Sequence, residues 1–331
     1  MALPGCGGGA AAAPVVLVIE DPSVPGARSI VTPAVLGVEL GLEGSGLRTR
    51  VVGPDVLDAG GGSVDEDVVA AVIAPFTDPS DGTLTTLGDA LVPIVSLSDL
   101  TEGSPSEAPP MRALVPPVDV SADAARPAGC AAGDGSAWSE EFLDALAPVD
   151  RLPGGPAEVA AAAADRECEG VVWSGDASGG AALAGFLSDT APQVILTVAA
   201  PGRTPGSADE IPLGVAVSGL CPCVDLTTST APAAQRFLHR YQAANGLEAG
   251  PFAVEGFDAG RLLADLASAS ATREALADAL ATIDRFEGLA GSYAWDEEGD
   301  LVDPIVRMYE RVGFRWLARA PGRVASETTQ A

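Results

Sequence analysis

Short apolar runs alternate along the chain with longer amphipathic segments, a pattern typical of parallel sheets whose strands are connected by helices. We predict strands at the apolar runs 15–19, 47–52, 68–73, 91–96, 170–173, 194–198 and 214–218. We predict helices at 27–42, 83–90, 139–147, 156–165 and 179–188. The pattern therefore indicates an α/β fold built on parallel sheets.

The last third of the chain gives the clearest helical patterns. Three helices are predicted there, at 231–244, 254–268 and 272–283. In the first, Phe237 and Tyr241 lie four residues apart on one face, and Gly246 follows as a stop signal. Thr272 is the predicted cap of the third. We interpret the apolar stripes of these helices as core and not as contacts to a cofactor.

Residues 101–135 differ from their surroundings, being rich in Pro, Ser, Ala and Gly with little periodicity. We predict an irregular connection there, at a boundary between two lobes. The length of 331 residues agrees with two medium-sized cores, since domains usually contain roughly 100–200 residues.

The charge balance excludes one class of partner. The formal net charge is −28, and all 18 basic residues are arginines. Nucleic acids and anionic lipid surfaces bind mainly through Lys and Arg, so neither is expected as a partner. The acidic residues are scattered, which indicates a solubilising surface. Although the mean hydropathy is +0.26, no run reaches the roughly 18–20 apolar residues of a membrane-spanning helix.

Cys6 stands apart from the other cysteines. It follows Leu3-Pro4-Gly5 and precedes a Gly/Ala run, which resembles a bacterial lipobox. In such signals the cysteine carries diacylglycerol and a flexible tether follows it. The charged and apolar stretches of a signal peptide do not precede Cys6, so the printed sequence is expected to be a shortened form. An incidental cysteine in a disordered N-terminus is the alternative.

Four cysteines are left, namely Cys130, Cys168, Cys221 and Cys223. An even number suits an oxidising compartment and predicts at least one disulfide, with three pairings possible. The Cys221-Pro222-Cys223 segment could not supply four zinc ligands, and the chain has a single histidine. We therefore expect neither a metal site nor a cofactor.

Catalytic patterns are weak. The segment Gly175-Asp176-Ala177-Ser178-Gly179-Gly180 resembles the nucleophile segment of serine proteases, but an extra alanine interrupts it. The single histidine, His239, falls off the apolar stripe of its helix and is predicted to be exposed, so it leaves Ser178 without a base. No pair of carboxylates is singled out for glycosidase chemistry, and phosphate-binding glycine motifs are missing. We predict that the chain is not an enzyme.

From residue 231 onward the order of features becomes specific. The sequence runs through Gln235-Arg236-Phe237, Tyr241-Gln242, Gly256-Phe257-Asp258-Ala259, Phe286-Glu287-Gly288, Gly291-Ser292-Tyr293, Asp296-Glu297-Glu298-Gly299-Asp300 and Val306-Arg307-Met308-Tyr309. This order resembles the C-terminal part of the type I periplasmic binding proteins, in the branched-chain amino-acid-binding (Leu/Ile/Val-binding) branch that serves ABC transporters. The match covers roughly the last 90 residues well, whereas for 15–218 it rests on strand order and on the placement of polar loops.

The resemblance implies two Rossmann-like lobes with parallel sheets, joined by a three-strand hinge, around a cleft that closes on a ligand. Residues 1–13 would be the tether and 319–331 a C-terminal tail. Lobe 1 would comprise 14–112 plus 233–300, and lobe 2 would comprise 113–232 plus 301–318.

The resemblance also implies binding residues in lobe 1. Thr77 and Ser80 follow the predicted strand 68–73, and Ser96 and Ser98 end the next one. Matching loops in the family offer hydroxyl and backbone N–H groups to a ligand carboxylate. Ser80 and Ser98 are alternatively helix caps. Phe257, where the family commonly has tyrosine, is a candidate pocket wall or an ordinary core residue.

In lobe 2, Trp138 is the candidate aromatic that packs on the ligand, and Ser174 and Asp176 are candidates for lining the cleft. Glu210 matches loosely an acidic position that binds an ammonium group in amino-acid-binding members. A neighbouring position that is often acidic is Leu213 here, which puts amino-acid specificity in doubt.

The resulting hypothesis is an extracytoplasmic, lipid-anchored solute-binding protein of an ABC importer. It would bind an amino acid or another small carboxylate or amide between its lobes, and its partner would be a membrane permease. A ligand-sensing receptor domain is the first alternative. A scaffold that has lost its ligand is the second, favoured by the short stretch 101–135.

Overall fold

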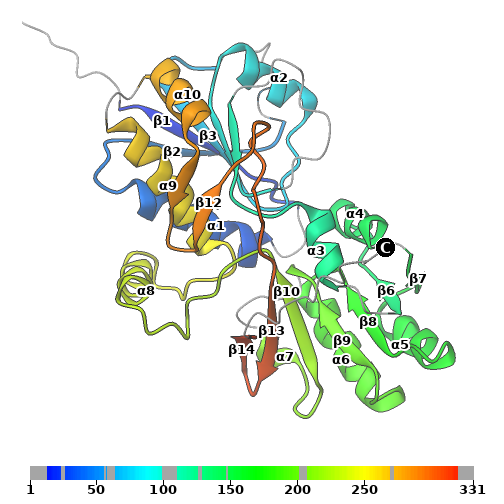
Figure 1. Cartoon of the computed structure of the whole chain (residues 1–331). Coiled ribbons are helices and arrows are strands. Elements are labelled where there is room, and N and C mark those ends of the chain that lie inside the picture. The colour runs from blue at the N-terminus through cyan, green and yellow to red at the C-terminus, as the bar shows by residue number, and fades with distance from the viewer. Residues whose placement is uncertain are drawn as a thin grey trace, which may run out of the picture.

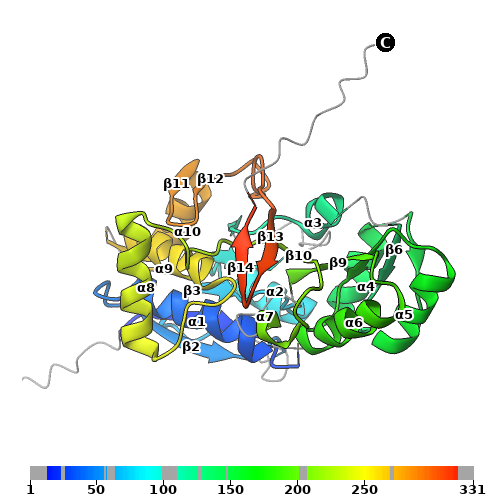
Figure 2. The same cartoon turned by 90° about the horizontal axis from the view of Figure 1, so that it is seen from below.

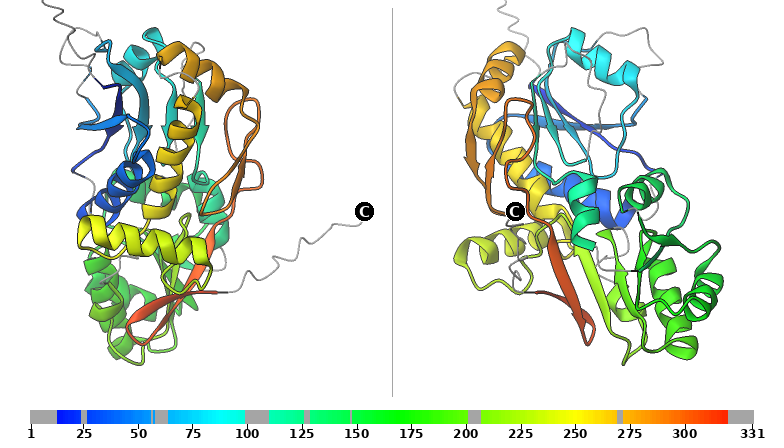
Figure 3. Two further views of the ribbon diagram at one scale, coloured as in Figure 1. Left: turned by 90° about the vertical axis from the view of Figure 1, so that its left-hand side faces the viewer. Right: turned by 45° about the vertical axis from the view of Figure 1, so that its right-hand side comes forward.

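The chain folds into two halves, each built on its own sheet, in the computed structural model (Figure 1). The structure describes residues 13–23, 27–55, 57, 64–98, 110–125, 129–146, 148–200, 207–268 and 272–319. We call the half with the five-stranded sheet lobe 1 and the half with the seven-stranded sheet lobe 2. Figure 3 shows the two lobes one above the other.

Lobe 1 contains a fully parallel sheet of order β2-β1-β3-β4-β5. Its strands are β1 (Val15–Ile19), β2 (Arg48–Val52), β3 (Val68–Ile73), β4 (Ile94–Ser96) and β5 (Met111–Ala113). Every residue of β1 and β3 is buried, which explains why both strands are unbroken apolar runs.

Glycines bring two helices of lobe 1 into backbone contact. The helices of this lobe are α1 (Ala27–Leu42), α2 (Asp81–Asp89), α8 (Pro232–Asn245), α9 (Ala253–Ala267) and α10 (Arg273–Thr282). A Cβ atom at Gly37 of α1 would lie 2.3 Å from the carbonyl oxygen of Ala253, and one at Gly256 of α9 would lie 2.1 Å from that of Ala34. Only glycine permits this approach, which fixes the position of α9 and of the residues at its N-terminus.

Lobe 2 contains a mixed sheet of order β14-β13-β10-β9-β8-β6-β7. Its strands are β6 (Cys130–Ala132), β7 (Asp150–Arg151), β8 (Gly170–Trp173), β9 (Ile195–Val198), β10 (Val217–Cys221), β13 (Arg307–Val312) and β14 (Arg315–Ala318). Its helices are α3 (Val118–Ala125), α4 (Ala137–Ala145), α5 (Pro156–Asp165), α6 (Ala177–Thr190) and α7 (Ser207–Glu210). Strands β6 to β10 are parallel, whereas β13 and β14 form an antiparallel hairpin at one edge. Seen from below, this hairpin lies between α8 on one side and α5 and α6 on the other (Figure 2).

The chain passes between the lobes three times, after β5, after β10 and after the small antiparallel sheet of β11 (Arg285–Glu287) and β12 (Ser292–Ala294). Hydrogen bonds hold these crossing segments. The Trp295 indole N–H donates to the Ala113 carbonyl oxygen at 2.6 Å, and the Tyr309 hydroxyl donates to that of Cys223 at 2.9 Å. The predicted fold class of two lobes joined by a three-strand hinge is therefore confirmed, whereas the predicted residue boundaries of the lobes stay a proposal.

Three details of the structure differ from the sequence predictions. Within 101–135, the described residues form β5, α3 and β6, so this stretch is more than an irregular connection. Its strands have only three residues each and α3 is rich in alanine, which hides the periodicity. The strand predicted at 214–218 lies at Val217–Cys221, and the antiparallel β13–β14 hairpin departs from the expected parallel pattern.

Both cysteine pairs within the described residues form disulfides. Cys130 of β6 is bonded to Cys168, which follows α5, and Cys221 is bonded to Cys223 at the end of β10. This selects one of the three possible pairings. Cys6 lies outside the described residues.

Candidate functional site

A cavity of about 600 Å³ lies between the two lobes. Its lining comes from loops after β1, β3 and β4 of lobe 1, from loops after β6 and β8 of lobe 2, and from the segments that cross between them. The carboxyl ends of parallel strands thus face the cavity from both sides, which is where open α/β sheets usually bind ligands.

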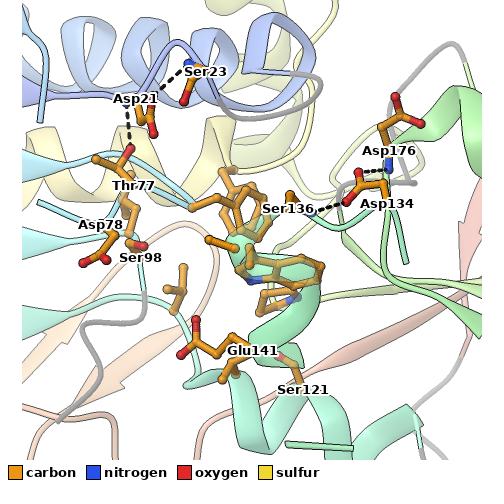
Figure 4. Close-up of a pocket in the computed structure, with 18 of the residues that line it drawn as sticks. Asp21, Ser23, Thr77, Asp78, Ser98, Ser121, Asp134, Ser136, Glu141 and Asp176 are labelled. Atoms are coloured by element: carbon orange, nitrogen blue, oxygen red, sulfur yellow. Dashed lines mark hydrogen bonds between the residues drawn. The ribbon is translucent and has the colours of Figure 1, made fainter. Parts of the chain in front are cut away.

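On the lobe 1 side, one buried hydroxyl connects two loops. Thr77 is fully buried, and its Oγ1 accepts a hydrogen bond of 3.1 Å from the backbone N–H of Asp21 (Figure 4). Ser98 follows β4 and is 8% exposed at the cavity. The loops after β1 and β3 are therefore held together beside the cavity.

On the lobe 2 side, two aspartates connect the loops after β6 and β8. The Asp134 carboxylate accepts a hydrogen bond of 3.0 Å from the backbone N–H of Ser136 and another of 3.0 Å from that of Asp176. Asp176 in turn caps α6, since its carboxylate accepts from the Gly179 N–H at 2.7 Å. The positions of these aspartates are thereby fixed by the backbone.

A buried pair of hydroxyls supports the same loops from beneath. The Oγ atoms of Ser139 and Ser174 are 2.7 Å apart, and both residues are fully buried. A Cβ atom at Gly133 would lie 1.9 Å from the Ser139 Oγ, so the backbone before the Asp134 loop passes directly over this pair. Ser174 therefore positions the loop and does not line the cavity.

Three aromatic rings form a connected cluster at the cavity. The Phe76 ring lies 4.9 Å from the Trp138 ring and 5.5 Å from the Phe252 ring, centroid to centroid, in edge-on geometry. Phe76 and Phe252 have φ angles of 58° and 61°, in the left-handed region that bulky residues avoid. Strain of this kind is common at ligand sites, where the surrounding structure holds it in place.

The charged side chains among the described residues that line the cavity are all acidic. Among the described residues that line it are the carboxylates of Asp21, Asp78, Asp134, Glu141 and Asp176, and none of these lining residues is arginine or histidine. Lysine is absent from the sequence altogether. The cavity is therefore acidic.

Four of the predicted binding residues line this cavity. They are Thr77, Ser98, Trp138 and Asp176, which come from both lobes. Ser96 lies just behind Ser98, where it is fully buried and its Oγ donates to the Ser98 carbonyl oxygen at 2.6 Å.

Ser80, Glu210 and Phe257 lie elsewhere. Ser80 caps α2 by accepting a hydrogen bond from the Thr83 N–H, which is the alternative role predicted for it. Glu210 is exposed at the end of the short helix α7. Phe257 packs on Phe237 with ring centroids 5.1 Å apart, in the core between α8 and α9.

Sequence reasoning missed several lining residues. Asp21 and Asp134 are each the second residue after a buried strand, β1 and β6 respectively. This position was a usable signal for Asp21, because β1 was predicted, but not for Asp134, because β6 was not. Phe76 and Phe252 gave no signal, because a left-handed phenylalanine next to a cavity cannot be distinguished from a core residue by sequence.

The described residues contain no group of three or more His, Cys, Asp or Glu side chains arranged to hold a metal ion. None of the helices described has the length and apolar character needed to cross a bilayer.

Comparison with known proteins gives matches at the level of structure. No family model and no curated protein sequence matches the chain. Among solved structures, LivJ of Streptococcus pneumoniae, a branched-chain amino acid transporter substrate-binding protein in complex with isoleucine, superposes with a TM-score of 0.68 at 15% identity, over 92% of this chain and 97% of its own. A leucine-binding protein LivK of Thermotoga maritima has a TM-score of 0.69 at 16% identity, over 93% and 98%.

A third structure binds a different ligand. It is an ABC transporter solute-binding protein of R. palustris in complex with benzoate, with a TM-score of 0.65 at 15% identity, over 92% of this chain and 95% of its own. These proteins share an arrangement of elements over nearly the whole of both chains, at low sequence identity. The chain therefore has the fold of the type I periplasmic binding proteins.

Proposed function

We propose that the chain is an extracytoplasmic solute-binding protein that presents a small molecule to the permease of an ABC importer. The cavity between the lobes is the observation that carries this proposal, because loops of both sheets line it. The structural neighbours named above are transporter binding proteins, which supports the same role.

The lining explains how binding would be coupled to the shape of the molecule. Thr77 and Ser98 belong to lobe 1, whereas Trp138 and Asp176 belong to lobe 2. A solute that contacts both sets stabilises the arrangement in which the lobes approach each other. A permease that recognises this arrangement would distinguish the loaded protein from the empty one.

The proposal includes binding without chemical conversion. His239, the single histidine of the sequence, is exposed on α8 and is not among the residues that line the cavity. Ser178, in the segment that resembles a protease nucleophile, instead donates to the Asp176 carboxylate at 3.1 Å. A serine–histidine mechanism would need these two side chains together.

Attachment to the membrane through a lipid on Cys6 is part of the same proposal and rests on the sequence around that residue. Expression of the protein in a bacterium with Cys6→Ser tests it. The variant should move from the membrane fraction to the soluble fraction, with the wild-type protein as control. Equal distribution of the two proteins would contradict the anchor.

Thermal-shift screening of the full chain tests solute binding. The panel contains amino acids, aromatic acids, amides and amines, because a compound that binds only the folded state raises Tm. At least one compound should raise Tm for the wild type and not for Trp138→Ala. A panel in which no compound raises Tm would contradict the proposal.

A further inference from the structure

We infer that the solute is a small organic cation, held in the cavity by carboxylates and aromatic rings of both lobes. This inference rests on the proposed function and names the class of solute for the same site.

The first argument is the charge of four aspartates at the cavity. Asp21 and Asp78 face it from lobe 1, and Asp134 and Asp176 face it from lobe 2 (Figure 4). No arginine in the described part of the chain forms an ion pair with any of these four aspartates. Like charges raise each other's energy in a partly enclosed space, and a bound cation would relieve that repulsion.

The aspartates divide into two kinds. Asp21, Asp134 and Asp176 accept backbone N–H groups and hold their loops in place. Asp78 is exposed at the cavity and has no hydrogen-bond partner within the described residues. Its carboxylate is therefore free to pair with a cation that enters the cavity, whereas the other three contribute charge from fixed positions.

The aromatic cluster adds a second attraction. Phe76 and Trp138 are partly exposed where they line the same cavity as the aspartates, and the buried Phe252 packs against Phe76. Aromatic faces attract ammonium groups through their negative quadrupole, and they pack against the methyl or methylene groups that such cations carry. Carboxylates and aromatic rings together suit an organic cation better than a hydrated metal ion.

A hydroxyl without a protein partner supplies an independent indication of a ligand. Ser98 is 8% exposed at the cavity, and no residue of the described structure hydrogen-bonds its side chain. Its backbone N–H and carbonyl are both paired with Ser96. The Ser98 hydroxyl can therefore accept from an ammonium N–H or donate to a hydroxyl of the solute.

An anionic solute fits the same cavity poorly. A carboxylate would have to leave water for a space that contains several carboxylates, and none of the described residues that line it is an arginine or histidine that could pair with it. The anionic group of a zwitterion would meet the same carboxylates. The Ser98 N–H, which could have bound a carboxylate, already donates to Ser96 Oγ at 3.1 Å.

Calorimetric titration of the full chain tests the inference with charged and uncharged pairs of the same shape. The cations are choline, putrescine and 3-methylbutylamine, and their counterparts are 3,3-dimethylbutanol, 1,4-butanediol and 3-methylbutanol. At least one cation should bind about tenfold or more tightly than its counterpart. Equal affinity within every pair, or no binding of any cation, would overturn the inference.

Leucine and benzoate separate this inference from the proposed function. If either binds and no cation does, solute binding stands and the cationic solute is wrong. If leucine, benzoate and the cations all fail to bind, both proposals fail.

A pair of variants locates the effect. Asp21→Asn with Asp78→Asn removes two charges at the cavity, while each asparagine keeps an oxygen that can accept a hydrogen bond. Asp89→Asn with Asp278→Asn removes two charges from exposed positions of lobe 1 outside the lining. The first variant should lose about tenfold or more in affinity for the cation and the second should lose much less. Equal losses would show that the net charge of the protein, and not the cavity, attracts the cation.

Discussion

The ring of Phe76 meets the ring of Trp138 edge-on across the boundary of the two lobes, at an interplanar angle of 74°. Phe76 follows β3 in lobe 1, and Trp138 lies in the first turn of α4 in lobe 2. On its other side Trp138 stacks on Phe142 of the same helix, with ring centroids 5.2 Å apart. The indole is thereby held between the core of lobe 2 and the phenylalanine of lobe 1, directly at the cavity.

This arrangement predicts that Trp138→Ala weakens solute binding strongly. The substitution removes both a wall of the cavity and the contact between the lobes, so an affinity loss of about tenfold to a hundredfold is expected. Calorimetric titration with the best compound of the screen measures it. Phe314→Ala, at an exposed phenylalanine outside the cavity lining, is the control and should bind normally. Unchanged affinity of the Trp138 variant would place the solute elsewhere.

Most of the fold could be predicted from patterns that burial imposes. Strands β1 and β3 are buried throughout and appear in the sequence as unbroken apolar runs. Helix α10 was predicted from its cap, and the Thr272 hydroxyl does accept from the Ala275 N–H. Short strands such as β5 and β6 were missed, because three residues carry too little periodicity.

The candidate site was predictable only in part. Thr77 and Ser98 were found because polar residues after buried strands face the same edge of a sheet. Which loops meet across the lobes, however, depends on the order of the strands in each sheet. Ser174 lies beneath its loop because Gly133 leaves room there for the Ser139 and Ser174 hydroxyls to pair. The sign of the cavity's charge depends on residues from four loops and from helix α4, so no single stretch of sequence shows it.

Contact between α1 and α9 predicts a strong response to one added methyl group. Gly256→Ala would place a Cβ atom 2.1 Å from the Ala34 carbonyl oxygen, so the helices must separate. We expect a loss of roughly 1–3 kcal/mol or more in the free energy of unfolding, measured by chemical denaturation.

Gly185→Ala is the matched control for that variant. Gly185 also lies within a helix, but the nearest atom to its added Cβ is 3.8 Å away. Alanine should therefore stabilise the protein by about 0.5–1 kcal/mol through its helix propensity. A similar loss of stability in both variants would show that the close contact between α1 and α9 is not the reason why glycine is required at position 256.

The two disulfides should differ in their contribution to stability. Cys130–Cys168 closes a loop between residues 38 apart, whereas Cys221–Cys223 joins residues two apart. A disulfide lowers the entropy of the unfolded chain more when it closes a longer loop. For a loop of the first size this stabilises the folded protein by roughly 4 kcal/mol. The double variant Cys130→Ala with Cys168→Ala should therefore lose far more stability in chemical denaturation than Cys221→Ala with Cys223→Ala. The reverse order would contradict the loop-entropy argument.

Glu255 of α9 predicts a pH dependence of stability. Burial raises the pKa of its carboxyl from 4.5 to about 8, although the Val224 N–H donates to its Oε1 at 2.6 Å. The other oxygen, Oε2, is buried without a hydrogen-bond partner. Between these two pKa values the unfolded chain loses the proton of Glu255 while the folded chain keeps it. Because the folded state binds more protons in that window, the free energy of unfolding falls as the pH rises from 4.5 to about 8.

Glu255→Gln isolates this effect, because glutamine does not titrate and can still accept from the Val224 N–H. Near pH 4.5 the carboxyl is protonated in the folded protein, so the variant and the wild type should differ least there. The stability of the variant relative to the wild type should then rise steadily toward pH 8, by an amount on the order of a few kcal/mol. Urea denaturation of both proteins at a series of pH values measures the difference. A difference that stays constant over this range would mean that Glu255 is already ionised in the folded protein at the lowest pH.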